Sequence, residues 1–296
     1  MKNLSVFFAI PALISILIIS GIAGCPSTTT GKVLTSGIEM TFVKDAPPIG
    51  VEVGKEFPIY VDIINKGGEF VNKGQASFYL GNLGPNFENI KTSLTNEKTL
   101  AKDSIYPDRL VFAEKAKFTF PLQAILPTPL VLTACYDYSG RAQAGLCISA
   151  SNESKVCSIA GEKVTDNTAG PVQVTSVTES ATRNKLTLVI EIANKGSANS
   201  EVFLADTDCD KLEAKDFAES QKQGKVNMVI TTKDNFKCKL ISQTGQIEGL
   251  EGIAPLGKII CEKDISTEDY PSAITIEFRY KFRESISQTI NVLPSA

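Results

Sequence analysis

Apart from Cys25, six cysteines are the residues of this chain best suited to covalent chemistry. An even set favours disulfide bonds over free thiols if the chain is exported. A zinc site is the alternative, but the sequence has no Cys-x-x-Cys pair and no histidine to complete one. We therefore expect three disulfides among six residues: Cys135, Cys147, Cys157, Cys209, Cys238 and Cys261.

A run of alternating carboxylates, Asp206, Asp208 and Asp210, is the second candidate site. Oxygen ligands at this spacing suit calcium. A helix-loop-helix calcium site is rejected, because its sixth position is Lys211 rather than glycine and its twelfth is Phe217 rather than glutamate. A looser calcium site between strands remains an alternative to an ordinary acidic loop. We expect no other metal and no cofactor.

The absence of histidine limits the possible functions. It removes Ser-His-Asp and Cys-His catalysis, imidazole acid-base chemistry and nearly every transition-metal site built with imidazole. An enzyme that uses carboxylates alone or a Ser-Lys pair remains possible. The net charge is -3 with both signs interspersed, so we expect no nucleic-acid partner.

The amino-terminal segment predicts export. Lys2 precedes an apolar run that ends in Ile-Ala-Gly-Cys at Cys25. These four residues resemble the lipobox of secreted lipoproteins, which implies a signal peptide over residues 1–24 and a lipid on Cys25. A cleaved but unlipidated signal and an uncleaved helical anchor are the alternatives, since about 20 apolar residues can span a bilayer. Residues 25–37 include a small, polar stretch that predicts a flexible tether.

Strand patterns dominate the rest of the chain. Residues 56–67 and 185–196 both alternate apolar and polar positions and both end in Asn-Lys-Gly. The predicted inward residues are Phe57, Ile59, Val61 and Ile63 in the first segment and Leu186, Leu188, Ile190 and Ile192 in the second. The offset, 194 minus 65, is 129 residues, about the length of one sandwich domain. We expect an all-β chain with two tandem antiparallel β-sandwiches, residues 38–160 and 171–296, joined by a linker over residues 161–170.

A second repeated pattern predicts that each sandwich closes on a hairpin. Residues 130–138 resemble residues 274–282, and polar turns are expected at residues 139–141 and 283–285. Cys135 and Cys147 are symmetric about Arg141, so we expect them to form a disulfide. Cys238 with Cys261 is the next expected pair, which leaves Cys157 with Cys209.

Two smaller features complete the pattern. Residues 212–223 are rich in helix formers and predict one short, solvated helix. Asn152 begins an Asn-Glu-Ser triplet, a weak acceptor pattern for N-glycosylation.

The approach over residues 51–57, the alternating strand and the Asn-Lys-Gly turn together resemble the immunoglobulin-like, cell-adhesion-related repeats of bacterial and archaeal surface proteins. The resemblance implies two immunoglobulin-like sandwiches that act as surface modules, with no catalytic residues.

We therefore expect a non-catalytic binding or structural protein, anchored to the outer face of a membrane by a lipid or an amino-terminal helix. Its partner would be a protein or a glycan, contacted through residues 206–210 and the turn at residues 81–87. The alternatives are an accessory subunit of an envelope transport or secretion complex and a histidine-free hydrolase.

Overall fold

The computed structural model describes residues 35–150, 154–163, 165–182, 184–242, 245–265 and 268–295. The predicted signal segment, Cys25 and Asn152 lie outside the described residues. The strands of the described part form a four-stranded and a fourteen-stranded sheet, and nearly all of their pairings are antiparallel. This confirms the predicted all-β, antiparallel class. Among the described residues, no helix has the length and apolar character needed to cross a bilayer.

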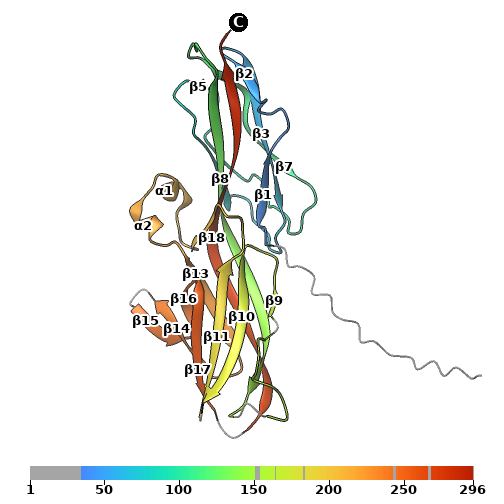
Figure 1. Cartoon of the computed structure of the whole chain (residues 1–296), viewed down its shortest axis with the longest axis vertical. Coiled ribbons are helices and arrows are strands. Elements are labelled where there is room, and N and C mark those ends of the chain that lie inside the picture. Colours follow the sequence, from blue (N-terminus) through green and yellow to red (C-terminus); the bar gives the residue numbers. More distant parts are fainter. Residues whose placement is uncertain are drawn as a thin grey trace, which may run out of the picture. The chain divides into compact units, whose positions relative to one another are not determined.

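The elements follow one another in two series, each ending in a long strand (Figure 1). The first series is β1 (Ile38–Phe42), β2 (Gly50–Glu52), β3 (Glu56–Asn65), β4 (Ala76–Gly81), β5 (Phe87–Glu88), β6 (Ser93–Thr95), β7 (Asp108–Phe118) and β8 (Leu126–Ile148). The second is β9 (Thr165–Asn167), β10 (Val172–Thr182), β11 (Lys185–Asn194), β12 (Ser200–Leu204), α1 (Cys209–Glu213), α2 (Phe217–Ser220), β13 (Lys225–Thr232), β14 (Lys237–Ser242), β15 (Gly245–Gly249), β16 (Glu251–Pro255), β17 (Gly257–Asp264) and β18 (Tyr270–Leu293).

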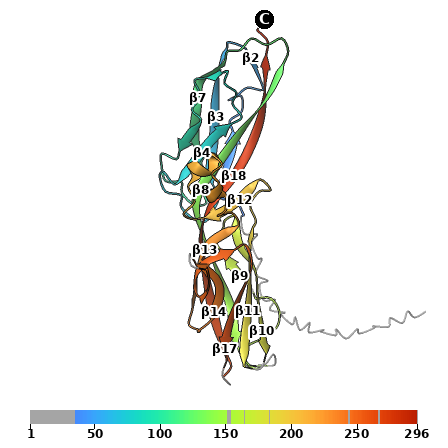
Figure 2. The ribbon, with the colours of Figure 1, turned by 90° about the vertical axis from the view of Figure 1, so that its left-hand side faces the viewer.

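The long strands β8 and β18 form a ribbon that both series of strands share. They pair antiparallel from Leu126 opposite Val292 to Ile148 opposite Tyr270, and they lie side by side in Figures 1 and 2. The first half of β8 pairs with β4 and its second half with β9. The first half of β18 pairs with β13, and its end pairs with β2 of the first series.

The predicted closing hairpins are wrong, because residues 139–141 lie inside β8 and residues 283–285 lie inside β18. In β8, the polar Ser139 and Arg141 occupy outward positions of the strand. Tyr138, Gly140 and Ala142 are buried in alternation with the less buried Ser139 and Arg141, so the pattern of period two continues through the expected turn. The second arm of each expected hairpin therefore pairs with the other series.

Residues Val33–Ala296 cluster as one compact unit. The structure shows the antiparallel sheets that the sequence predicts, but it does not show two tandem immunoglobulin-like sandwiches divided at residues 161–170.

The repeated segments do occupy equivalent positions. β3 pairs with β1 and β7, and β11 pairs with β10 and β17. All eight predicted inward residues of β3 and β11 are buried. Each strand ends in the same turn, since Asn65 accepts a hydrogen bond from the Gly67 N–H at 3.1 Å and Asn194 accepts one from the Gly196 N–H at 2.9 Å.

A column of aromatic side chains fills the middle of the ribbon. Tyr138 faces Tyr280 across the strands, and Tyr136 faces Phe282, with the Asp137–Lys281 ion pair (2.7 Å) between the two pairs. The tyrosine hydroxyls fasten the edge strands. The Ile38 N–H of β1 donates to Tyr136 Oη at 3.0 Å, and the Val172 N–H of β10 donates to Tyr280 Oη at 3.3 Å.

Three disulfides join the six cysteines outside the amino-terminal segment, and one of the predicted pairs is confirmed. Cys238 is bonded to Cys261, its partner across β14 and β17. The other two predicted pairs are wrong. Cys135 is bonded to Cys209 and Cys147 to Cys157, because Cys135 and Cys147 lie twelve residues apart on one continuous strand, about 40 Å at 3.3 Å per residue.

Peptide mapping of the non-reduced protein should report this continuous strand directly. Trypsin cuts after Arg141 and so separates Cys135, in residues 118–141, from Cys147, in residues 142–155. We expect residues 118–141 to be linked to residues 196–211, which carry Cys209. Mass spectrometry of the linked peptides measures this. A link between residues 118–141 and 142–155 would instead indicate a closed hairpin and contradict the ribbon.

Candidate functional site

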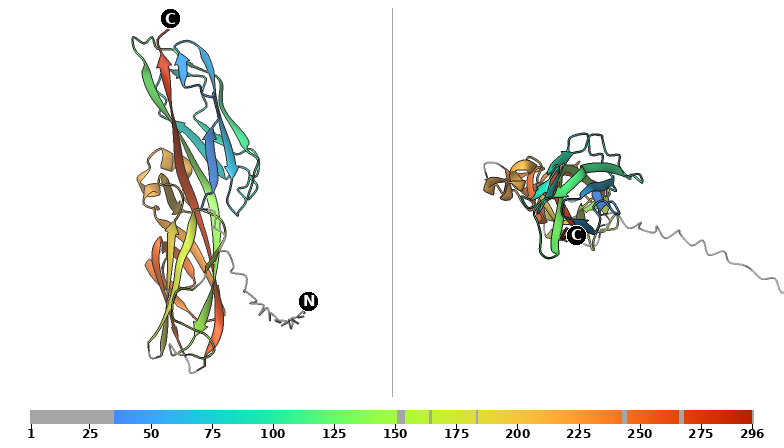
Figure 3. Two further views of the ribbon diagram at one scale, coloured as in Figure 1. Left: turned by 45° about the vertical axis from the view of Figure 1, so that its right-hand side comes forward. Right: turned by 90° about the horizontal axis from the view of Figure 1, so that it is seen from above.

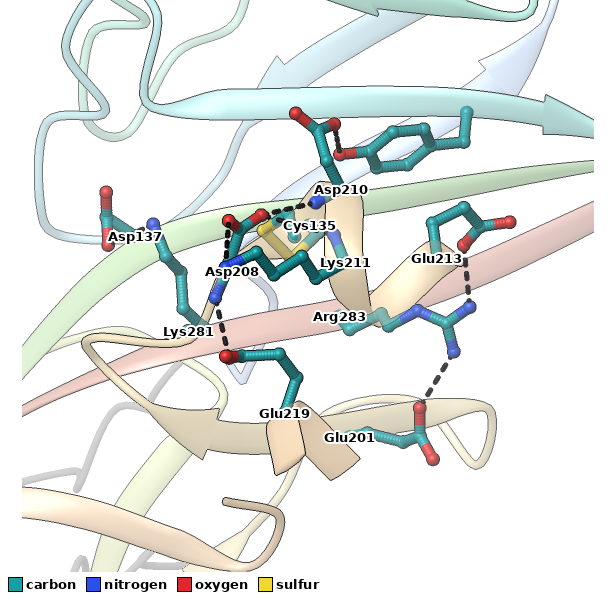
Figure 4. The surroundings of a disulfide bond; sticks show 12 residues. Cys135, Asp137, Glu201, Asp208, Asp210, Lys211, Glu213, Glu219, Lys281 and Arg283 are labelled. Carbon is teal, nitrogen blue, oxygen red and sulfur yellow. Dashed lines mark hydrogen bonds and ion pairs between the residues drawn. A yellow bond between two sulfur atoms is a disulfide. The ribbon is translucent and has the colours of Figure 1, made fainter. Parts of the chain in front are cut away.

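The acidic segment singled out by the sequence lies in an excursion between β12 and β13. We call residues 205–223, which include α1 and α2, the flap. A disulfide joins Cys209 of α1 to Cys135 of β8 (Figure 4). The views of Figures 1 and 3 agree that α1 and α2 lie across the ribbon from β1 and β3. The flap is thus a surface element bonded covalently to the ribbon.

The single helix predicted for residues 212–223 is two short helices in the structure. Asp208 caps α1 by accepting hydrogen bonds from the N–H groups of Asp210 (3.0 Å) and Lys211 (3.2 Å), and Asp216 caps α2. Lys215 between them has a positive φ of 63°, which ends α1. The hydrogen bond from the Lys211 N–H is the main reason why the pKa of Asp208 is lowered.

Asp210 fastens the flap to the first series of strands. Its carboxylate accepts a hydrogen bond of 2.7 Å from the hydroxyl of Tyr79, a residue of β4 (Figure 4). Burial raises the pKa of Tyr79, and this hydrogen bond raises it further. The contact brings one of the segments predicted to bind a partner, residues 206–210, onto the strand that leads into the other, residues 81–87.

That second segment is only partly available for contacts. Phe87 at its end belongs to β5 and packs edge-on against Phe118, with the ring centroids 5.0 Å apart. Its side chain therefore serves packing rather than recognition.

Lys222 forms ion pairs with two further acidic groups of the flap, Asp206 and Glu219. Its ammonium lies 3.4 Å from Asp206 and 3.0 Å from Glu219. Glu219 also accepts a hydrogen bond from the Asp208 N–H at 2.9 Å. This hydrogen bond, followed by Lys222, lowers the pKa of Glu219. The three aspartates of the weak calcium alternative thus have separate partners. No set of three metal-ligating side chains gathers anywhere in the described residues.

Arg283 supplies a second electrostatic anchor that the sequence did not predict. From β18 it donates hydrogen bonds to Glu201 of β12 at 2.9 Å and to Glu213 of α1 at 3.0 Å (Figure 4). Burial alone would lower the pKa of Arg283, but the two carboxylates raise it, so the guanidinium stays charged. These partners are 70 to 82 residues away in the chain, a separation at which residue patterns carry no signal.

The assembled site is a fixed, acidic surface. Six acidic and three basic residues give the flap a net charge of 3 minus 6, or -3. Its largest exposed apolar side chain is Phe217, which is 77% exposed at the start of α2. The charged groups point at different partners rather than at one centre.

Removing the disulfide should loosen the flap without unfolding the sheets. In the double variant Cys135→Ser/Cys209→Ser, we expect the amide hydrogens of α1 and α2 to exchange about tenfold faster or more. Without the covalent bond to β8 the flap can open locally at a lower free-energy cost. Hydrogen exchange with mass spectrometry measures this. The matched control, Cys147→Ser/Cys157→Ser, should leave flap exchange unchanged. Equal exchange in both variants would show that the hydrogen bonds alone hold the flap.

The three disulfides of the described part indicate an extracytoplasmic protein, since such bonds persist in oxidising compartments. Fold and site together thus define a disulfide-bonded, all-β extracytoplasmic protein.

Comparisons with known proteins do not narrow this class. No family model matches the sequence, and no curated protein sequence matches it either. Two solved structures align with it at 10% identity. They are the secreted serine protease VesC from Vibrio cholerae, with a TM-score of 0.20 over 85% of this chain, and an Escherichia coli alpha-2-macroglobulin activated by porcine elastase, with a TM-score of 0.14 over 87%. The alignments span 51% and 32% of those chains, and scores this low carry no argument about fold or function.

Proposed function

We propose that this protein is a membrane-tethered, non-catalytic binding or structural protein displayed outside the cytoplasm. One observation carries the proposal. The Cys135–Cys209 disulfide, with Tyr79 and Arg283, fixes an acidic and partly exposed flap onto the ribbon. Fixing a surface element in this way lowers the entropy cost of binding, because the contact residues are already ordered. The flap is therefore our proposed contact surface.

The tether is the amino-terminal part of the proposal. The lipobox-like sequence at Cys25 lies ten residues before Thr35, the first described residue. A lipid at Cys25, or an uncleaved helix before it, would hold the described unit close to a membrane.

The resemblance to immunoglobulin-like repeats is a further part of this proposal. The equivalent positions of β1, β3 and β7 and of β10, β11 and β17 favour two related sandwich-like halves that share the ribbon. We propose that these halves serve as a surface module, as in the adhesion-related repeats that the sequence resembles.

Fractionation of cells that make the full chain tests the tether. We expect the protein in the membrane fraction, with a mature amino terminus at Cys25 by mass spectrometry. Cys25→Ala should block that processing. An unprocessed Met1 start would overturn the lipoprotein form, and recovery of the protein in the cytoplasm would overturn the whole proposal.

A binding comparison tests the role of the flap. Full-length protein, immobilised through a carboxy-terminal tag, is exposed to solubilised proteins and glycans from the envelope of its own cells. A flap variant, Asp206→Asn/Phe217→Ser, changes two groups that are mostly exposed, and Glu162→Gln/Val156→Ser is the control at another exposed site. We expect a retained species that only the flap variant loses. Equal retention by all three proteins would overturn the flap as the contact surface.

A further inference from the structure

Two loops at one end of β3 are joined into a single surface. We call residues 65–70 and 100–106 the loop pair. The Ser104 N–H donates to the Asn65 carbonyl at 2.8 Å, and the Asp103 N–H donates to the Gly67 carbonyl at 3.0 Å. The Lys66 ammonium adds a hydrogen bond of 3.0 Å to the Ser104 carbonyl. These bonds give the loop pair a defined conformation.

The loop pair presents large apolar side chains to solvent. Phe70 is 55% exposed, Ile105 72% and Tyr106 78%, although each would be more stable out of water. The ammonium of Lys102 lies 5.7 Å from the centre of the Phe70 ring. Aromatic and aliphatic side chains beside a lysine are the composition of a surface that inserts at the level of lipid headgroups.

Charge is a secondary factor in this surface. Lys66 and Lys102 are offset by Glu69 and Asp103 within the same loops. The loop pair therefore has no net charge, and attraction to a membrane would come from the apolar side chains.

The position of the loop pair relative to the start of the described chain points to the membrane as its partner. The Lys66 N–H donates to the Gly37 carbonyl at 2.8 Å, so the loop pair adjoins the place where the chain enters the described unit. In Figure 1 the loop that enters β7 lies beside this starting point. The ten residue-to-residue steps from Cys25 to Thr35 span at most about 35 Å when extended. A membrane anchor at Cys25 thus keeps the bilayer within reach of the loop pair.

We infer that the loop pair is a membrane-docking surface, in which Phe70, Ile105 and Tyr106 insert among lipid headgroups and fix the orientation of the tethered protein. The inference rests on the proposed amino-terminal anchor. The exposed apolar side chain of Phe120, which is 54% exposed, supplies the comparison. Phe120 follows Phe118 by two residues, and Lys117 pairs with Glu56, the first residue of β3. Phe120 thus lies at the end of β3 away from the loop pair, about 30 Å along a ten-residue strand.

A tryptophan reporter tests the inference cleanly, because the sequence contains no tryptophan. Full-length Tyr106→Trp is reconstituted into vesicles of phosphatidylcholine and phosphatidylglycerol, with and without lipids brominated near the headgroups. We expect a blue-shifted emission that falls by about half or more with the brominated lipids, since an interfacial side chain lies 5–10 Å deep. Phe70→Trp is a second reporter with the same expectation, and Phe120→Trp is the matched control that should stay unquenched.

The outcomes separate the inference from the proposal on which it rests. If the full chain fails to enter vesicles, the anchor fails. If the chain enters but the emission of neither Tyr106→Trp nor Phe70→Trp is quenched, the docking surface is overturned while the anchor stands. A blue shift that needs no vesicles and grows with protein concentration would assign the loop pair to contact between two copies, and it would also overturn the inference.

Discussion

Replacing Glu179 by alanine is expected to lower the free energy of unfolding by about 3–5 kcal/mol at neutral pH. The side chain of Glu179 is fully buried, and that of Lys163, 2.8 Å away, is only 12% exposed. The same carboxylate accepts the Cys147 N–H at 3.0 and 3.1 Å. Burial raises the pKa of Glu179, while Lys163 and the Cys147 N–H lower it. The alanine variant leaves a buried ammonium and a buried N–H without this acceptor, and the loss of these interactions sets the size of the effect.

Urea unfolding with the disulfides intact measures this loss. Glu262→Ala is the matched control, because Glu262 forms a similar 3.1 Å pair with Lys185 whose side chains are 39% and 57% exposed, and surface pairs of this kind contribute little. In the double variant Lys163→Met/Glu179→Ala we expect a smaller loss than the sum of the two single losses, since no buried charge is left unpaired. Equal losses in Glu179→Ala and Glu262→Ala would contradict the burial of this pair.

The buried pair also shows what a sequence pattern cannot predict. Alternation identified the inward faces of β3 and β11 correctly, because burial on one face of a strand is a local property with period two. Lys163 and Glu179 are polar residues, and nothing in their neighbourhood in the chain marks them as buried. Their burial depends on contacts with β10, because the Cys147 N–H donates to Glu179 and the Lys163 N–H donates to the Val177 carbonyl.

The prediction of two closing hairpins was wrong for a related reason. Ser139, Gly140 and Arg141 are common turn residues, but in an alternating strand they also suit two outward positions and a small inward one. Gly140 faces Phe278 across the ribbon, and a β-carbon there would lie 2.3 Å from that ring. The glycine is thus needed for close packing rather than for a turn.

Whether each predicted disulfide was right depended on the course of the strands that carry the cysteines. Cys238 and Cys261 are opposite each other on neighbouring strands, and this predicted pair is confirmed. The partners of Cys135 and Cys147 depended on whether residues 139–141 turned, and both pairings were wrong once that segment proved to be straight.

The candidate site was predicted in its composition but not in its contacts. Asp206, Asp208 and Asp210 were identified as a group, with a weak calcium site as the alternative to an ordinary acidic loop. The structure shows instead that each serves a different partner, and Tyr79, which holds Asp210, is 131 residues away. A contact of that separation follows only from the packing of β4 against the ribbon.

Glu284 should make the stability of the protein depend on pH across the neutral range. Burial raises its pKa to about 7, while a hydrogen bond from the Tyr136 hydroxyl (3.2 Å) opposes the shift and the charge of Glu39 adds to it. The folded chain holds the Glu284 proton up to about pH 7, whereas the unfolded chain releases it near the ordinary value of 4.5. Stability should therefore fall as pH rises through this window, by about 3 kcal/mol in total at 1.36 kcal/mol per pKa unit.

Glu284→Gln should remove this part of the pH dependence. The amide oxygen can still accept the Tyr136 hydroxyl, but it carries no charge into the buried site, so the variant should match the parent protein near pH 4.5 and exceed its stability by up to about 3 kcal/mol at pH 8. Urea midpoints measured at half-unit steps from pH 4.5 to 8 give the two curves. Glu39→Gln is the control and should keep most of the slope, because Glu39 makes the smaller contribution to the raised pKa. Parallel curves for the parent and Glu284→Gln would show that Glu284 is solvated. They would also show that β1 and β18 do not cover this carboxyl group.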